Sequence, residues 1–199
     1  MRSLARLAGR FGLLAILGIS LAGCGVNNIP SQEEAAKAKW SQVLNQYQRR
    51  ADLIPNLVET VKGYAKQEAQ VLEAVVAARV RATSVQVPPD ILTNPEAFKK
   101  FQEAQSQLSA SLGRLLAISE NYPDLKSNQN FLALQSQLEG TENRISVARR
   151  DYIEAVQAYN TELRTFPGVI WASTLYKGNK PMETFTIAEE TKRPPQVKF

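Results

Sequence analysis

Three long stretches of the sequence repeat mostly apolar residues at alternating spacings of three and four. The average spacing of 3.5 residues predicts helices with one apolar seam each, as in coiled coils, and argues against the two-residue alternation of β-strands. The three seams comprise Tyr47, Ala51, Ile54, Val58, Val61, Ala65, Glu68, Leu72 and Val75; then Phe98, Phe101, Gln105, Leu108, Leu112, Leu115, Ser119 and Tyr122; then Phe131, Leu134, Leu138, Thr141, Ile145, Ala148, Tyr152, Ala155, Tyr159, Leu163 and Phe166. Because such seams must be buried against one another, the sequence predicts an all-α protein, folded as a long antiparallel up-and-down helical bundle.

Local signals predict where these helices begin. Ser31 and Glu34 form a capping box for the first helix. Asn94, followed directly by a proline and a glutamate, is typical of the start of the second helix. Ser127 or Asn128 is positioned to cap the third.

Pro55 lies inside the first seam, where a proline loses its backbone hydrogen bond and crowds the carbonyl of Ala51. The seam keeps its phase through Pro55, so we expect one long helix, kinked at that residue, and not two separate helices. A helix of this length matches its shorter partners only if the kinked helix counts as two segments. The bundle is therefore expected to contain four helical segments.

The first 24 residues have the pattern of a secretory signal. Three arginines precede the apolar stretch 11–21, which is shorter than the roughly 20 residues that span a bilayer. Leu21-Ala22-Gly23-Cys24 resembles the lipobox of bacterial lipoproteins, which implies cleavage before Cys24 and lipidation of its thiol. The alternative is an N-terminus kept as a membrane helix.

The expected organisation follows from these boundaries. Residues 1–23 are a cleaved lipoprotein signal peptide and residues 24–30 a tether. Residues 31–168 form the helical bundle, and residues 169–199 a short helix with an extended tail. The chain is expected in the bacterial cell envelope, facing the periplasm and held at the membrane by lipid on Cys24. Gly25, in place of an aspartate after Cys24, favours the outer membrane over the inner membrane.

Composition argues against several classes of function. Three of the 24 basic residues and none of the 19 acidic ones precede Cys24, so the net charge falls from +5 to +2 after cleavage. This balance, without a basic stripe, argues against nucleic-acid binding. The sequence has no histidine, and its one cysteine is assigned to lipid, so histidine- or thiol-based catalysis is not expected. No cofactor, metal site or catalytic residue is predicted.

The segment around Pro55 departs from a single apolar stripe. Its apolar residues spread around most of the helix, so this turn must be covered on two sides. Either the bundle's own helices and tail cover it, or a partner protein docks there within a polar rim. The candidate partner-binding residues are Arg49, Arg50, Asp52, Leu53, Pro55, Asn56 and Leu57.

A second unusual segment, residues 139–144, places a glycine and several polar side chains near the third seam. Gly140 costs a helix about 1 kcal/mol relative to alanine, which a close helix approach would explain. The candidate polar network, which would fix helix register, consists of Thr141, Glu142, Asn143 and Arg144. The alternative is an envelope or cell-wall hydrolase that uses the carboxylates of Glu139, Glu142 or Asp52.

The same segments resemble the motifs of the LemA family. The resemblance is carried by residues 49–64, 120–126, 131 with 134–135, 138–145, 148–152 and 159–167, and it covers about residues 38–168. It implies an up-and-down helical bundle behind an N-terminal membrane segment, and it supplies no catalytic residue or cofactor. Gln67 replaces a histidine that is common in the family, Ile153 replaces an asparagine, and the lipobox replaces a membrane helix.

The leading functional hypothesis is a membrane-anchored, non-enzymatic scaffold or adaptor for another envelope protein, with self-association as a further expectation. The hydrolase is the first alternative. The second is a carrier of a lipid or small molecule, which needs a cavity between the helices, whereas seams rich in leucine, phenylalanine and tyrosine predict a filled core.

Overall fold

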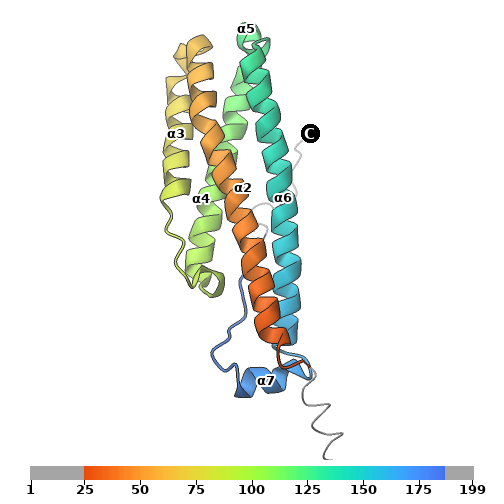
Figure 1. The fold of residues 1–199 in the computed structure, drawn as a ribbon. Helices are drawn as coiled ribbons and strands as arrows, with labels where there is room; N and C mark the ends of the chain where they lie inside the picture. Colours follow the sequence, from red (N-terminus) through yellow and green to blue (C-terminus); the bar gives the residue numbers. More distant parts are fainter. Residues whose placement is uncertain (1–24, 187–199) are drawn as a thin grey trace, which may run out of the picture.

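Four long helices form the protein in the computed structural model, which describes residues 25–186. They are α2 (Asn28–Tyr64), α3 (Ala69–Ser84), α4 (Pro95–Ser119) and α6 (Gln129–Glu162). The short elements are η1 (Lys66–Glu68), η2 (Ile91–Thr93), α5 (Pro123–Lys126) and α7 (Gly168–Thr174). Successive long helices run in opposite directions (Figure 1), with α2 packed on α6 and α3, and α3 on α4. The all-α antiparallel bundle is thereby confirmed.

The predicted signal peptide, its cleavage site and Cys24 lie outside the described residues, as do residues 187–199 of the predicted tail. No helix between residues 25 and 186 combines the length and hydrophobicity that crossing a bilayer requires.

The seams form the buried faces of the helices and supply two core clusters. The first lies at the end of the bundle that holds the start of α2 and is built around aromatic rings, with the Trp40 ring centroid 5.3 Å from those of both Phe101 and Tyr152. The second lies towards the other end, and its members are mainly aliphatic, such as Ile54 and Leu115. Each fully buried side chain of this size contributes about 1.5–3 kcal/mol, so the seams supply the main driving force of the fold.

The predicted starts of α4 and α6 are confirmed. The side chain of Asn94 accepts a hydrogen bond from the Ala97 amide at 3.1 Å, and that of Asn128 accepts one from the Phe131 amide at 3.0 Å. The predicted start of the first helix is wrong, because α2 already begins at Asn28 and Ser31 is an exposed residue inside it. Burial of Ile29 explains the earlier start, since helical geometry turns this side chain into the core.

The first seam is divided between two helices, so the expected single long helix is wrong. Helix α2 continues through Pro55, but it ends at Tyr64, and the chain reverses through Ala65 and η1 before α3 begins. The predicted number of four helical segments is correct, but the first two are separated at Ala65 and not at Pro55. The phase of the seam survives because residues on both sides of the reversal, such as Val61 and Leu72, are buried in the same cluster.

Pro55 leaves a carbonyl in α2 without its helical donor, and α3 supplies a replacement. A proline has no N–H to give to the carbonyl four residues earlier, which here belongs to Ala51. Arg79 of α3 donates from its Nε to this carbonyl at 2.8 Å. The proline thus creates a polar anchor point between two helices, and its missing hydrogen bond is made by the neighbouring helix.

The helices differ in length, and this difference leaves the first half of α2 without α3 as a neighbour. Helices α2 and α6 have 37 and 34 residues, whereas α3 has only 16. Beyond Ser84, the loop that contains η2 and the segment after α7 take the place of α3. Met182 and Phe185 of that last segment are buried in the aromatic cluster. Residues 175–186 therefore lie along the bundle in the described part of the expected extended tail.

The third helix ends earlier than the seam predicted. Helix α6 stops at Glu162, and Phe166, counted as a seam residue, is 80% exposed. The backbone turns at residues 163–167, so Phe166 no longer shares the face of Tyr159. Helix α7 then forms where a short helix was expected.

Candidate functional site

Part of the predicted docking surface around Pro55 is internal. Leu57 is fully buried and Arg50 is 1% exposed, so these two residues cannot belong to an accessible surface, and that part of the prediction is wrong. Leu53 is half-buried against the aliphatic cluster. The reason is the reversal at Ala65, which brings α3 back along α2 and covers the second apolar side.

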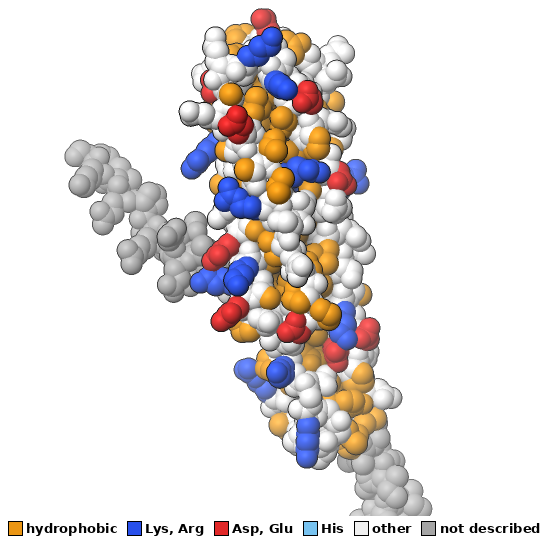
Figure 2. Space-filling model, turned by 90° about the vertical axis from the view of Figure 1, so that its left-hand side faces the viewer, with side chains coloured by type: hydrophobic (Ala, Val, Ile, Leu, Met, Phe, Trp, Pro, Cys, Tyr) orange, Lys and Arg blue, Asp and Glu red, His pale blue; other side chains and the backbone are white. Residues whose placement is uncertain are grey.

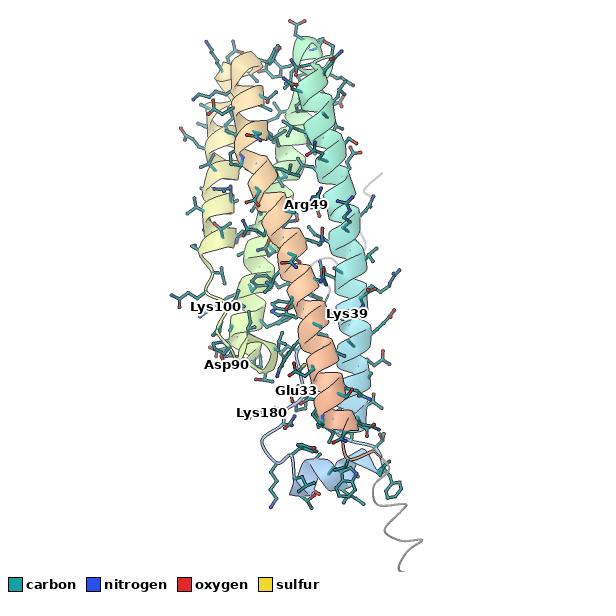
Figure 3. The ribbon with its side chains drawn as sticks, viewed as in Figure 1. Glu33, Lys39, Arg49, Asp90, Lys100 and Lys180 are labelled. Atoms are coloured by element: carbon teal, nitrogen blue, oxygen red, sulfur yellow. The ribbon has the colours of Figure 1, made fainter. Side chains whose placement is uncertain are left out.

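The other four residues of this prediction remain on the surface. Arg49, Asp52, Pro55 and Asn56 are exposed, and Figure 3 shows Arg49 midway along α2. Asp52 accepts a hydrogen bond from Gln48 of its own helix at 2.7 Å. These residues present a mainly polar surface without the apolar centre that a docking site needs.

Arg50 is instead the buried centre of a polar cluster, which we call the Arg50 cluster (Arg50, Gln105, Ser109 and Glu142). Its Nη1 donates to Ser109 Oγ at 2.6 Å and to Glu142 Oε1 at 2.8 Å, and its Nη2 donates to Gln105 Oε1 at 2.6 Å. Gln105 in turn donates from Nε2 to the carbonyl of Ala82 at 3.3 Å. The cluster therefore joins α2, α4 and α6 and, through Gln105, also α3.

The ring of Tyr47 completes the surroundings of Arg50, with its centroid 5.0 Å from the guanidinium carbon. A cavity of about 60 Å³ adjoins the cluster and is bordered by Arg149 and Ser146. This volume has room for about two water molecules. Its size, and the engagement of Arg50 by protein groups, are typical of a structural polar cluster.

The candidate polar network in α6 is split between different environments. Glu142 belongs to the Arg50 cluster, whereas the buried Thr141 hydroxyl donates to the carbonyl of Gln137 in its own helix at 2.7 Å. Asn143 and Arg144 are exposed and line a shallow hollow between α2 and α6. The network thus contains one of the four predicted residues, together with Arg50, which was assigned to the docking surface.

The carboxylates of the hydrolase alternative do not share a cleft. Glu139 accepts a hydrogen bond from Gln135 at 3.0 Å, and neither Glu139 nor Asp52 borders the cavity that Glu142 lines. Within residues 25–186, no group of three or more acidic, histidine or cysteine side chains is arranged to hold a metal ion.

Gly140 has no close neighbour, so the expectation of a tight helix approach is wrong. A Cβ atom built on this residue meets no heavy atom within 4 Å. We expect Gly140→Ala to raise the free energy of unfolding by about 0.5–1 kcal/mol, because alanine is the better helix former and fits without strain. Urea denaturation followed by circular dichroism measures the change, and a loss of stability would show that the glycine serves packing after all.

A large hollow lies beside the first half of α2, on the side that α3 does not reach. It has a volume of about 590 Å³ and is enclosed by the first half of α2, the loop around η2 and the segment that follows α7. Figure 3 shows Glu33, Asp90 and Lys180, one from each of these segments, in the same part of the molecule. Its apolar lining includes Trp40, Leu44, Val87, Ile91, Leu92 and Met182.

A second hollow of about 360 Å³ continues the first along α2. Leu44 and Val87 line both, and Tyr47, Ala51 and Phe101 extend the apolar floor. We call the two together the α2 groove. Along α2 it extends from Glu33 to Ala51, or about 27 Å at 1.5 Å per residue. Figure 2, which views the molecule from the side on which α3 lies, shows hydrophobic side chains among charged ones on the surface.

The polar groups of the α2 groove are held in fixed positions. Asn179 donates to Glu33 at 2.8 Å and to the Tyr159 hydroxyl at 3.2 Å, while Lys37 pairs with Glu33 at 2.7 Å. Burial raises the pKa of Tyr159, and hydrogen bonds to Glu33 and Glu34 raise the pKa of Lys37. At neutral pH Tyr159 therefore keeps its proton and Lys37 is a cation, both beside the apolar floor of the groove.

Apolar periodicity identified neither the Arg50 cluster nor the α2 groove, although both left a signal in the sequence. Arg50 stands in phase with Val43, Tyr47, Ile54, Leu57 and Val61, all of which are buried. An arginine in such a row indicates a buried partner on a facing helix. The groove left a weaker signal, namely the mismatch in helix lengths, because its shape depends on where the η2 loop and the C-terminal segment lie.

Comparison with known proteins agrees with the resemblance to the LemA family seen in the sequence motifs. The chain is 26% identical over 157 residues to magnetosome protein MamQ 2 of Paramagnetospirillum magneticum (strain ATCC 700264 / AMB-1), covering 71% of this chain and 58% of that protein. Magnetosome protein MamQ of Magnetospirillum gryphiswaldense (strain DSM 6361 / JCM 21280 / NBRC 15271 / MSR-1) matches with the same identity and coverage. Protein LemA of Metamycoplasma hominis (strain ATCC 23114 / DSM 25592 / NBRC 14850 / NCTC 10111 / PG21) is 27% identical over 118 residues, 59% of this chain and 49% of that protein.

The chain thus spans about half to three fifths of the length of these curated relatives. The family model described as LemA family matches residues 39–199, which extends the resemblance seen in the motifs to the end of the sequence. On this match, the chain belongs to the LemA family.

Proposed function

We propose that this chain is a membrane-anchored, non-enzymatic scaffold or adaptor of the bacterial cell envelope, and that its α2 groove holds a segment of a partner protein. The observation that carries the proposal is the groove itself. It combines an apolar floor with a rim of fixed charges of both signs, on a face where the bundle has no fourth helix. This combination is typical of protein-binding surfaces.

The proposed membrane anchor is lipid on Cys24, and its support is the sequence pattern that ends at this residue. A basic start, a short apolar stretch and Leu21-Ala22-Gly23 before the cysteine support lipidation and a position facing the periplasm. Gly25 supports delivery to the outer membrane in an organism with two membranes. A diacylglycerol and an amide-linked chain together provide the two hydrophobic attachments that stable anchoring takes.

The dimensions of the groove suit an extended polypeptide. A length of about 27 Å accommodates roughly eight residues of an extended chain at 3.3 Å each. Apolar side chains at alternate positions of that segment would contact Trp40, Leu44 and Val87, and its polar residues would face the charged rim. Each apolar side chain buried in this way contributes about 1.5–3 kcal/mol before the entropic costs of binding.

The volume of the first hollow favours a second candidate, a small amphipathic molecule. Sites for such ligands have volumes of roughly 300–1,000 Å³, and 590 Å³ lies within this range. The exposed side chain of Lys180, which lines this hollow, would bind the polar end of the molecule. This carrier function would use a hollow beside the bundle and not the cavity between helices that the sequence hypothesis required.

A photo-crosslinking amino acid in living cells tests the proposal. Ser41 is exposed and lines the groove, whereas the exposed Ser136 of α6 lies outside it and provides the matched control. We expect the same envelope protein to be captured at Ser41 in repeated experiments and to be absent at Ser136. Capture of a second copy of the chain would identify the partner as the protein itself, and capture of a small molecule would favour the carrier. Equal capture at both positions would contradict a role for the groove.

A further inference from the structure

Four exposed apolar side chains lie close together in the sequence around α7. Phe166, Val169, Ile170 and Leu175 are 80%, 41%, 44% and 64% exposed. The other large exposed apolar residues of the described chain are distributed over the long helices and the η2 loop. A patch of this kind on a polar bundle indicates a surface that is covered in the working protein.

This patch lies at the end of the bundle where the N-terminal segment is attached. Asn28, the first residue of α2, donates to Glu162 at the end of α6 at 3.3 Å. A Cβ atom built on Gly25 would lie 3.3 Å from the ring of Pro167, directly before α7. Figure 1 shows α7 beside the start of α2, at the lower end of the molecule. Cys24, the proposed lipid attachment site, is the residue that precedes Gly25.

The charges around α7 match an anionic surface. Between Glu162 and Glu183 the sequence contains Arg164, Lys177 and Lys180 and no acidic residue, and all three are exposed. Trp171 and Tyr176, in or next to α7, pack against the aromatic core cluster and fix the short helix to the bundle. Apolar and basic side chains on one short segment are the combination by which peripheral helices bind lipid headgroups.

We infer that α7 and its flanking residues 164–177 lie on the membrane surface, with the apolar side chains inserted among the lipids of an anionic bilayer. The inference rests on the proposed anchorage at Cys24, which brings the membrane to this end of the bundle. Two attachments, the lipid and α7, hold the bundle in a fixed orientation with its far end directed away from the bilayer. The α2 groove, whose lining includes Gly178 and Lys180, is then open close to the membrane.

Lipid-quenching fluorescence tests this orientation. The full chain is produced with Ile170→Cys, so that the introduced thiol takes an environment-sensitive dye after Cys24 has been lipidated. The protein is reconstituted into phosphatidylcholine vesicles with and without phosphatidylglycerol, both with a headgroup-level quencher lipid. Leu132→Cys is the matched control, because Leu132 is similarly exposed (48% against 44% for Ile170) but lies near the start of α6, at the other end of the bundle. Leu175→Cys provides a second position on the patch if the first variant folds poorly by circular dichroism.

With the quencher lipid present, we expect dyes at positions 170 and 175 to lose most of their emission. Without the quencher, we expect their emission to shift to the blue. A dye at position 132 should show neither change. The loss should be larger in vesicles that contain phosphatidylglycerol. Flotation of the same vesicles tests the anchorage separately. If the protein floats but emission at 170 and 175 resembles that at 132, the orientation is wrong and the anchorage stands. If the protein does not float, the proposed anchorage itself fails.

Discussion

Replacement of Arg50 by alanine is expected to lower the free energy of unfolding by about 3 kcal/mol, or roughly 6–12 °C in melting temperature. The guanidinium is 1% exposed and donates to three side chains from two other helices. Without it, the buried Gln105 carbonyl oxygen loses its donor, and a cavity remains between the helices. Urea denaturation followed by circular dichroism measures the loss.

Arg49 provides the matched control for this experiment. It has the same charge and precedes Arg50 directly, but it is exposed, so Arg49→Ala should change stability by no more than about 0.5 kcal/mol. Arg50→Lys should recover only part of the loss, because an ammonium group cannot reach all the acceptors of the planar guanidinium. Equal effects of Arg49→Ala and Arg50→Ala would show that the cluster does not hold the helices together.

The second large effect is expected at the contact between Arg79 and the carbonyl that Pro55 leaves free. Arg79→Ala should lower the free energy of unfolding by about 1–3 kcal/mol, because the nearly buried carbonyl of Ala51 loses the donor that replaces its helical one. In the background of Pro55→Ala, which restores the backbone N–H, the same substitution should have a much smaller effect. A double-mutant cycle measures this coupling, which should exceed about 1 kcal/mol.

Arg81 is the control for the cycle, since it is an exposed arginine of the same helix. Arg81→Ala should have nearly the same small effect with proline or with alanine at position 55. Additive effects of Pro55→Ala and Arg79→Ala would mean that the carbonyl is satisfied in another way, and the proposed compensation between α2 and α3 would be wrong.

Much of this fold was predictable because apolar periodicity reports burial directly. Val61, Ala65, Leu72 and Val75 are all buried, as the first seam required. The same four residues show the limit of the method, because the chain reverses between the second and the third of them. A reversal that preserves the phase of a seam cannot be distinguished from a continuous helix by spacing alone. The caps at Asn94 and Asn128 were predictable, since they depend only on neighbouring residues.

The candidate site was less predictable, because it depends on contacts between segments far apart in the sequence. The sequence predicted Arg50 at the rim of a docking surface, because its partners Ser109 in α4 and Glu142 in α6 are far from it in the sequence. The α2 groove is lined by α2, the η2 loop and the segment after α7, together with residues of α3, α4 and α6. Its floor includes Met182, 138 positions from Leu44. Neither residue carries a local pattern that indicates the other, so only the folded arrangement shows that they line the same hollow.

The most direct test of the claim that the α2 groove holds a partner segment is the crosslinking yield at Ser41 in living cells. This yield is compared between two variants that each carry a new aspartate. Val87 lines both parts of the α2 groove and is 41% exposed, whereas Val80, 53% exposed on α3, lines neither part. If the groove holds a partner segment, Val87→Asp should abolish capture at Ser41 while Val80→Asp leaves it unchanged, with both variants retaining their melting temperatures. Unchanged capture in Val87→Asp would contradict the assignment of the groove as the partner-binding site.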